Sequence, residues 1–152
     1  MISGSTCIYF HYLIKPFYFP QRELTKSFIT SIFADFSKKI ETVNYVFCTD
    51  KYLLTMNETH LKHNYYTDII TFDLSIDELI IADVFISVER AKENAASFKV
   101  TLISEIIRLL IHGALHLCGH KDKTVEDSHA MRTLENNYLS QFWVSRETDK
   151  EF

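Results

Sequence analysis

The chain has 152 residues, of which 47% are hydrophobic and 24% charged, with only 3 glycines and 2 prolines. This composition excludes collagen-like, low-complexity and largely disordered proteins, and we expect a single domain over residues 1–152. The net charge of −4 argues against a protein held to nucleic acid by its overall charge. It leaves room for a local basic cleft.

Cysteine usage and hydropathy indicate the compartment. Cys7, Cys48 and Cys118 are widely spaced and odd in number, which favours reduced, buried thiols over a secreted disulfide framework. The most apolar run, about Ile103–Leu117, is interrupted by charged residues and histidines and is too short to span a membrane. No basic segment precedes an apolar stretch at the N-terminus, as a secretory signal would require. We therefore expect a cytoplasmic protein with no membrane partner.

The first sixty residues predict two strands and two helices. A strand is expected over Cys7–Leu13, before a segment punctuated by prolines. Apolar residues at helical spacing predict an amphipathic helix over Arg22–Ile40. The β-rich segment Thr42–Cys48 predicts a second strand. Asp50 is then the expected N-cap of a short helix that ends near Leu61.

A hairpin is predicted in the middle of the chain. Its strands are the β-rich runs Thr67–Ser75 and Glu78–Ser87, which a short polar turn separates. Ser87 is placed to cap a helix over residues 88–98.

Two more helices complete the predicted fold. One covers Leu102–Cys118 and stops at Gly119. The other starts at Thr124, with acidic residues in its first turn, and ends near Phe142 before a polar tail that we expect to be frayed. The predicted strands are concentrated early in the chain and the predicted helices late. This order indicates an α+β protein, with a small mixed sheet of about four strands packed with about five helices.

The segment RLLIHGALHLCGHKDKT, residues 108–124, places two histidines on an otherwise apolar helix. His112 and His116 are four residues apart, so their imidazoles share one face of the helix and can bind one metal ion together. Two core histidines hydrogen-bonded to the backbone are the alternative. The spacing alone leaves both interpretations open.

A third ligand must come from the turn after Gly119. Asp122 follows His116 by six residues, which matches the H-x3-H-x5-H spacing of zincins with a carboxylate in the third place. His120 is the second choice, because it shares the histidine face only if the helix continues through the glycine. His129 lies further along the chain, in the last predicted helix.

Gly113 directly follows the first histidine. Zincin peptidases carry a glutamate in this place, where it acts as general base. The helix is therefore zincin-like in its histidine spacing, but the sequence disfavours a peptidase.

The histidine segment HGALHLCGHKD, residues 112–122, resembles the signature of the YbeY family, single-strand-specific endoribonucleases linked to ribosomal RNA maturation. MNETHLKHNYYTDIITFDL, residues 56–74, and IADVFIS, residues 81–87, are similar to two further motifs of that family and follow in the same order. The resemblance covers about Met56–Thr124. It implies a small mixed sheet with helices, one of which carries the first two metal ligands.

The resemblance also implies a metal site and a reaction. His112, His116 and Asp122 would be the ligands of one Zn²⁺ or of another divalent ion such as Ni²⁺, with Asp122 in the place of the family's third histidine. The metal would assist cleavage of an RNA phosphodiester bond, as a Lewis acid or by lowering the pKa of bound water. The expected partners are single-stranded ribosomal RNA and the ribosome.

Leu61 departs from the family pattern, because it stands where the family has an arginine that helps to bind phosphate. Another cation near the metal turn would have to replace that charge. Lys62, Lys121 and Lys123 are the candidates.

Other matched residues have a functional and a structural interpretation. His60, Lys62 and His63 could line a locally basic groove for RNA, or belong to a solvated helix end. Thr67 and Asp68 match a Thr-Asp pair of the family. They could be hydrogen-bond partners of a metal histidine, or could shape the turn into the strand.

Three functions compete on this evidence. The first is a metal-dependent, single-strand-specific endoribonuclease acting in ribosomal RNA processing and ribosome quality control. The second is a non-catalytic, metal-stabilised domain that binds the ribosome or a protein such as a GTPase. The third is another metallohydrolase, such as an esterase or an aspartate-type zincin peptidase, although Gly113 argues against the peptidase. Leu61 separates the first from the second, because RNA cleavage requires a cation to hold the phosphate.

Overall fold

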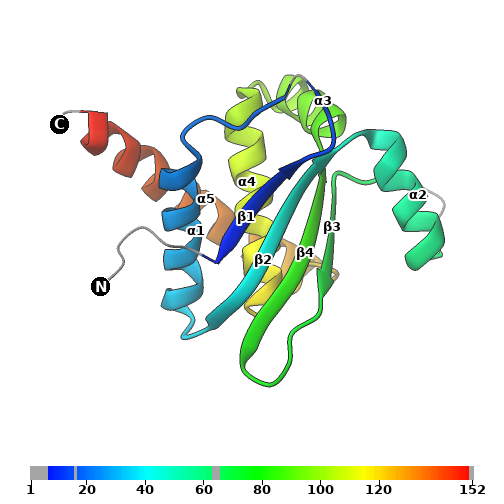
Figure 1. The fold of residues 1–152 in the computed structure, drawn as a ribbon. Coiled ribbons are helices and arrows are strands. Elements are labelled where there is room, and N and C mark those ends of the chain that lie inside the picture. Colours follow the sequence, from blue (N-terminus) through cyan, green and yellow to red (C-terminus); the bar gives the residue numbers. More distant parts are fainter. Residues whose placement is uncertain (1–6, 16, 63–65, 151–152) are drawn as a thin grey trace.

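The computed structural model describes residues 7–15, 17–62 and 66–150 (Figure 1). The elements in this part of the chain agree with the α+β class predicted from the sequence. In chain order they are β1 (Ile8–Tyr12), α1 (Arg22–Asp35), β2 (Lys39–Cys48), α2 (Asp50–His60), β3 (Ile69–Asp73), β4 (Leu79–Ser87), α3 (Val88–Phe98), α4 (Leu102–Leu117) and α5 (Val125–Lys150).

The strands form one mixed sheet in the order β1-β2-β4-β3. β1, β2 and β4 are parallel, whereas β3 pairs with β4 in the antiparallel sense, so the predicted hairpin is confirmed. Helices α1, α4 and α5 lie on one side of the sheet, and α2 lies on the other (Figure 1). β3 is therefore an edge strand between α2 and α4.

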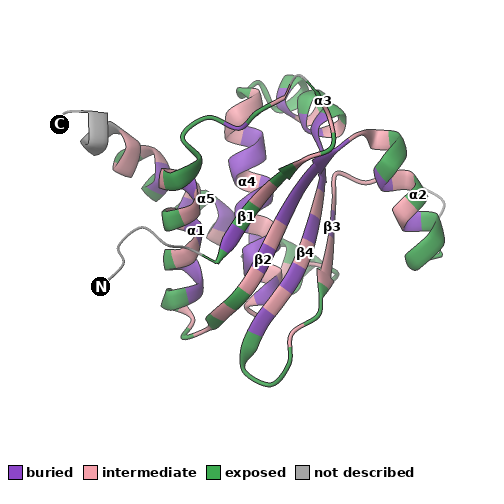
Figure 2. Ribbon diagram, in the orientation of Figure 1, coloured by how far each residue is buried: buried purple, intermediate pink, exposed green. Residues whose placement is uncertain are grey.

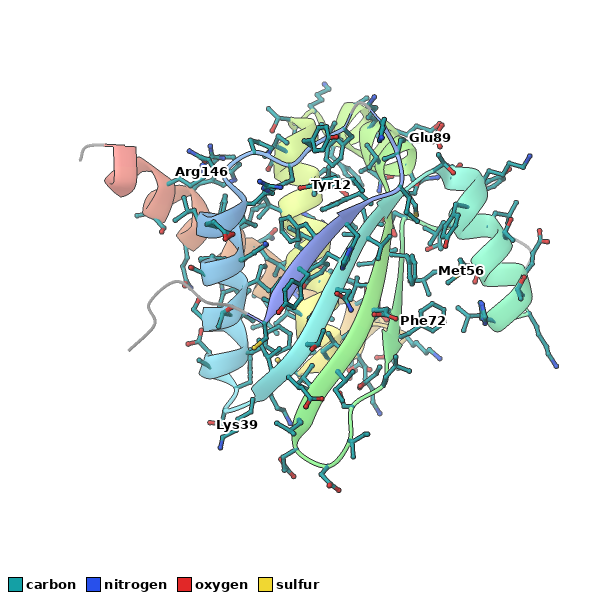
Figure 3. All side chains as sticks on the ribbon, viewed as in Figure 1. Tyr12, Lys39, Met56, Phe72, Glu89 and Arg146 are labelled. Atoms are coloured by element: carbon teal, nitrogen blue, oxygen red, sulfur yellow. The ribbon has the colours of Figure 1, made fainter. Side chains whose placement is uncertain are left out.

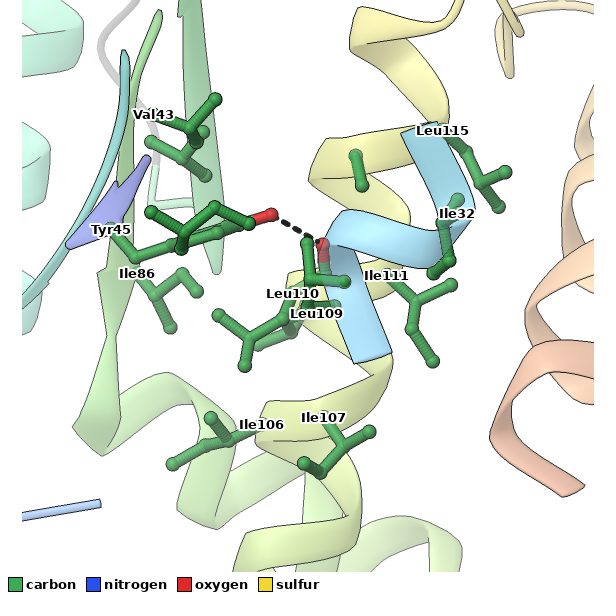
Figure 4. Packing of buried hydrophobic residues seen from close by; sticks show 14 of the residues in the cluster. Ile32, Val43, Tyr45, Ile86, Ile106, Ile107, Leu109, Leu110, Ile111 and Leu115 are labelled. Carbon is green, nitrogen blue, oxygen red and sulfur yellow. Dashed lines mark hydrogen bonds between the residues drawn. The ribbon is translucent and has the colours of Figure 1, made fainter. Parts of the chain in front are cut away.

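Helix α4 is the centre of the core (Figure 2). Most of its side chains are buried, because it packs between the sheet on one side and α1 and α5 on the others. Its backbone is also tied to the sheet, since the buried Tyr45 hydroxyl of β2 donates to the carbonyl oxygen of Leu110 at 3.0 Å (Figure 4). Burial raises the pKa of Tyr45, so its hydroxyl keeps the donated proton. These contacts fix the position of the helix that carries both histidines.

Helix α2 covers the other face of the sheet only near β3 and β4. Leu53 of α2 packs with Ile70 of β3 in a small separate apolar cluster. Met56 and Phe72 extend this cluster and lie between α2 and the sheet in Figure 3. The end of α2 is thereby held beside β3.

The first helix is shorter than predicted. It ends at Asp35, and Ser37 takes a positive φ of 57°. Lys38 N–H then donates to the carbonyl oxygen of Phe33 at 2.9 Å, which closes the helix with the reversed turn typical of C-termini. Ile40 fits the helical spacing by coincidence and belongs to β2.

The start of α2 also differs from the prediction. Its N-cap is Thr49, whose hydroxyl accepts the backbone N–H of Tyr52 at 3.1 Å. The Asp50 carboxylate instead accepts hydrogen bonds from Ser87 and Arg90 at the start of α3. The predicted caps Ser87 and Thr124 are both confirmed, because their hydroxyls accept backbone N–H groups of α3 and α5.

The last helix is longer than predicted. Instead of ending near Phe142, α5 continues to Lys150, so the tail expected to be frayed is helical up to that residue. The segment contains no glycine or proline to stop it. The Arg146 guanidinium also lies 4.9 Å from the centroid of a Trp143 ring one turn earlier.

The structure also bears on the cysteines and on membrane crossing. Cys7, Cys48 and Cys118 are all free thiols, as predicted, but only Cys48 is buried, whereas Cys118 is half-buried and Cys7 is exposed. Within the described ranges, no single helix has the length and hydropathy to cross a membrane. α3 and α4 meet that test only as a pair bent by 113°.

Candidate metal centre

The sequence places both histidines near the end of α4. Thr101 caps the start of this helix by accepting the Ser104 N–H at 3.1 Å. Gly119 takes a φ of +101°, which ends the helix as predicted and turns the chain back. His112 and His116 therefore remain on one face, and the reversed chain carries Asp122 towards them.

The donor atoms of His112, His116 and Asp122 converge. Nε2 of His112 lies 3.0 Å from Nε2 of His116, and both nitrogens lie 3.2 Å from Oδ2 of Asp122. The side chains are half-buried, and in the part of the chain that the structure describes they form the one such cluster able to hold a metal ion.

These separations match the demands of one ion. A tetrahedral zinc site with ligands about 2.0–2.1 Å from the metal holds its donor atoms roughly 3.3 Å apart. Two imidazole nitrogens and a carboxylate oxygen also suit zinc and related divalent metals. The three residues therefore fit a divalent ion both in spacing and in chemistry.

A buried carboxylate orients the first histidine. Oε2 of Glu135, on α5, lies 2.7 Å from Nδ1 of His112, and Oε1 accepts a 2.9 Å hydrogen bond from Arg108. Glu135 is only 5% exposed, so its charge depends on these two partners. With Nδ1–H donating to Glu135, the Nε2 atom of His112 carries the lone pair that a metal needs.

The pKa values of this pair shift in opposite directions. Burial lowers the pKa of His112, but the hydrogen bond and charge of Glu135, helped by Asp122, outweigh it, and the net pKa is raised. Burial raises the pKa of Glu135, but hydrogen bonds from His112 and Arg108 outweigh it, and the net pKa is lowered. Glu135 is therefore the ionised acceptor of the pair at neutral pH.

Gly113 faces the sheet and not the cluster. A Cβ atom at this position would lie 3.1 Å from Val84 Cγ1 and 3.5 Å from Ile69 Cδ1. A glutamate side chain at this position would press on these sheet residues, which agrees with the sequence-based argument against a peptidase.

The cluster lies in the wall of a cleft of about 680 Å³. β3 and the end of α2 also line this cleft, and Leu61 there is 40% exposed. Lys123 is the one lysine or arginine among the described residues that line this cleft. The remaining described lining residues are Asn57, Thr67, Asp68, Ile69, Ile70, Thr71, Asp73 and Leu117, beside the three donors.

The other ligand candidates lie outside the cluster of donor atoms. The His120 ring packs on Phe36 with centroids 4.7 Å apart. His129 lies on α5 in a neighbouring hollow. Of the third ligands considered from the sequence, only Asp122 meets His112 and His116 among the residues described.

The predicted hydrogen-bond partners of the histidines have other contacts. Thr67 Oγ1 donates to the carbonyl oxygen of Ile69 at 3.3 Å, and Asp68 accepts a 2.9 Å hydrogen bond from Asn94. The carboxylate that contacts Nδ1 of His112, on the side of the ring away from Asp122, is Glu135, which sequence reasoning missed. It lies 23 residues beyond His112, and no local spacing links the two.

The predicted RNA-binding residues are dispersed. Lys62, Lys121 and His60 are exposed but do not line the cleft, and the His60 ring contacts Phe72. His63 lies outside the described residues. Among the three candidate lysines, Lys123 alone lines the cleft.

Comparison with known proteins decides the family. A family model described as Endoribonuclease YbeY matches residues 19–143. The chain belongs to this family. The endoribonuclease YbeY of Flavobacterium psychrophilum is 42% identical over 120 residues, which are 79% of this chain and 86% of that protein. The endoribonuclease YbeY of Cytophaga hutchinsonii is 45% identical over 121 residues, covering 79% and 85%.

The fold agrees with this assignment to the YbeY family. The solution structure of TM1509 from Thermotoga maritima matches with a TM-score of 0.66 at 21% sequence identity, over 93% of each chain. Membership of the YbeY family identifies the chain as an RNA-cleaving hydrolase that acts on phosphodiester bonds. Of the three functions that the sequence left open, the comparisons support the endoribonuclease.

Proposed function

We propose that this YbeY-family enzyme cleaves single-stranded RNA during ribosomal RNA maturation, with one Zn²⁺ held by His112, His116 and Asp122. The donor triangle in the wall of the cleft carries the proposal, because its spacing suits one ion. A related divalent ion such as Ni²⁺ suits the same donors. The enzyme would work in the cytoplasm, on the ribosome or its precursors, and would take part in ribosome quality control.

Different residues of the protein would assist a bound metal ion in different ways. A bound divalent ion supplies Lewis-acid stabilisation of a phosphoryl oxygen and makes a water molecule more acidic. Glu135 keeps Nε2 of His112 available to that ion. Lys123, in the lining of the cleft, offers a positive charge to the phosphate. The cleft beside β3 would receive the single strand.

Metal content and RNA cleavage, measured on the same samples, test this proposal. We expect about one equivalent of metal in the wild type, and little in His116→Ala and Asp122→Ala, because the two remaining protein donors hold the ion poorly. Cleavage of single-stranded RNA should be lost in the same two variants.

His120→Ala is the matched control. It should retain the metal, because the His120 ring packs on Phe36 outside the donor cluster. Metal lost from His120→Ala but kept by Asp122→Ala would move the third ligand to His120. A metal-loaded wild type that cleaves no single-stranded RNA would contradict the proposed reaction.

A further inference from the structure

A second hollow begins where the cleft ends. It has a volume of about 540 Å³ and lies along the start of α5. The two hollows share Asp122 and Lys123, so a long molecule in the cleft can continue into the second one. We call this second hollow the α5 groove. Its lining residues are Asp122, Lys123, Thr124, Val125, Ser128, His129 and Arg132.

The α5 groove is locally basic, although the chain carries a net charge of −4. Lys123, His129 and Arg132 are exposed and line it. Asp122 is the one acidic residue in its described lining, and its carboxylate contacts the two metal histidines. The acidic residues in the first turn of α5 lie outside the lining. The groove therefore favours an anionic ligand.

Arg132 has a charge that its neighbours do not fully neutralise. Its Nη1 lies 3.7 Å from Oε1 of Glu135, but that oxygen already accepts a 2.9 Å hydrogen bond from Arg108. The other Glu135 oxygen contacts His112. The Arg132 side chain is 52% exposed, and its guanidinium lies 5.8 Å from the ring centroid of Phe98. Arg132 can therefore turn towards the groove without leaving Glu135 unpaired.

We propose that the α5 groove binds an RNA phosphate next to the one that is cleaved, with Arg132 as its cation and Lys123, which lines both hollows, between the two phosphates. The inference rests on the proposed function, because the ligand is the same RNA strand. A guanidinium can bind two phosphate oxygens in bidentate geometry, and an ammonium adds a compact charge. The groove thereby supplies positive charge in a hollow that Leu61 does not line.

RNA binding at several salt concentrations tests the role of Arg132. A fluorescein-labelled oligouridylate of about 12 nucleotides, within the usual site size for single strands, is titrated by fluorescence anisotropy. All variants carry His116→Ala so that the RNA stays intact. We expect Arg132→Gln to weaken binding roughly fivefold and to make the slope of log K against log salt shallower by about 0.7.

Two control variants accompany this measurement. Arg132→Lys keeps the charge and should keep the salt slope, even where it loses bidentate affinity. Lys92→Gln removes an exposed charge on α3, outside the lining of either hollow, and should bind RNA as the parent protein does.

Cleavage kinetics test whether the Arg132 substitution acts indirectly, by disturbing Glu135. In the metal-loaded enzyme with His116 intact, Arg132→Gln should raise KM roughly fivefold and leave kcat and metal content within about twofold of the wild type. A loss confined to kcat, or a loss of metal, would show that Arg132 acts through Glu135 and His112, and would overturn the groove as a phosphate site.

The results separate the two proposals. If the wild type cleaves single-stranded RNA, but Arg132→Gln keeps the salt slope of its His116→Ala parent and the KM of the wild type, the groove proposal is wrong and the proposed function stands. If the metal-loaded wild type neither binds nor cleaves single-stranded RNA, the proposed function itself fails.

Discussion

His112 and Glu135 join α4 to α5 through a 2.7 Å hydrogen bond between Nδ1 and Oε2. Arg108, one turn before His112, holds the other Glu135 oxygen at 2.9 Å. The histidine ring is therefore oriented by a carboxylate that is itself fixed on both oxygens. This arrangement leaves Nε2 of His112 as the donor atom that faces His116 and Asp122.

Replacing Glu135 should weaken metal binding without removing a ligand. We expect Glu135→Gln to raise the metal dissociation constant roughly 10–100-fold, because the neutral amide orients His112 less firmly and makes it less basic. Competition with a chromophoric chelator measures this constant. Glu93→Gln, at an exposed ion pair with Arg90, should leave it unchanged. Wild-type affinity in Glu135→Gln would show that the hydrogen bond has no part in metal binding.

A cation at position 61 should improve the binding of RNA. Leu61 is exposed and lines the cleft, so an arginine fits there without disturbing the core. Leu61→Arg should lower KM by roughly tenfold through a charge-assisted contact to phosphate, with little change in kcat. Leu61→Gln is the uncharged control and should behave as the wild type. An unchanged KM in Leu61→Arg would mean that the RNA passes this wall without a phosphate contact.

The raised pKa of Glu105 should make the stability of the protein depend on pH. Burial raises its pKa, a hydrogen bond from Asn94 opposes this, and the charge of Asp68 adds to the rise, with a net increase. The contribution of Glu105 to stability is therefore full below its unfolded-state pKa and is lost as the pH rises through the folded-state pKa. Glu105→Gln cannot ionise and keeps an acceptor for Asn94.

Urea unfolding at two pH values measures this effect. We expect Glu105→Gln to be more stable than the wild type at pH 7.5, and the difference to shrink towards pH 4, as Glu105 becomes protonated in both states. A variant less stable than the wild type at pH 7.5 would show that ionised Glu105 makes contacts worth more than its burial costs.

The three thiols should differ in reactivity. Burial raises the pKa of Cys118 to about 11, and burial with the charges of Asp50 and Glu89 raises the pKa of Cys48 to about 12. Cys7 is exposed. At pH 8 a disulfide reagent should therefore modify Cys7 quickly and the other two slowly, because only the thiolate reacts.

Counting released chromophore tests the order of reaction. The native wild type should show a single fast thiol, and Cys7→Ser should show none. The urea-unfolded protein should show all three. A fast phase that persists in Cys7→Ser would mean that Cys48 or Cys118 is more accessible than its burial implies.

Helix caps and helix ends could be predicted from the sequence without knowledge of the fold. The caps at Ser87 and Thr124 and the stop at Gly119 depend on hydrogen bonds and dihedral angles within a few residues. Ile40 shows the limit of such reasoning. Its position fits the helical spacing of apolar residues, but the helix ends before it, at Asp35, and Ser37 takes a positive φ.

Spacing along one short stretch is enough to predict the candidate metal-binding segment: a helix with His112 and His116 four residues apart, a glycine that reverses the chain, and a carboxylate that follows it. The contact of Glu135 with His112 and the position of Arg132 in the α5 groove depend instead on the packing of the whole chain. These residues come from another helix, and the packing of α5 against α4 brings them to the site.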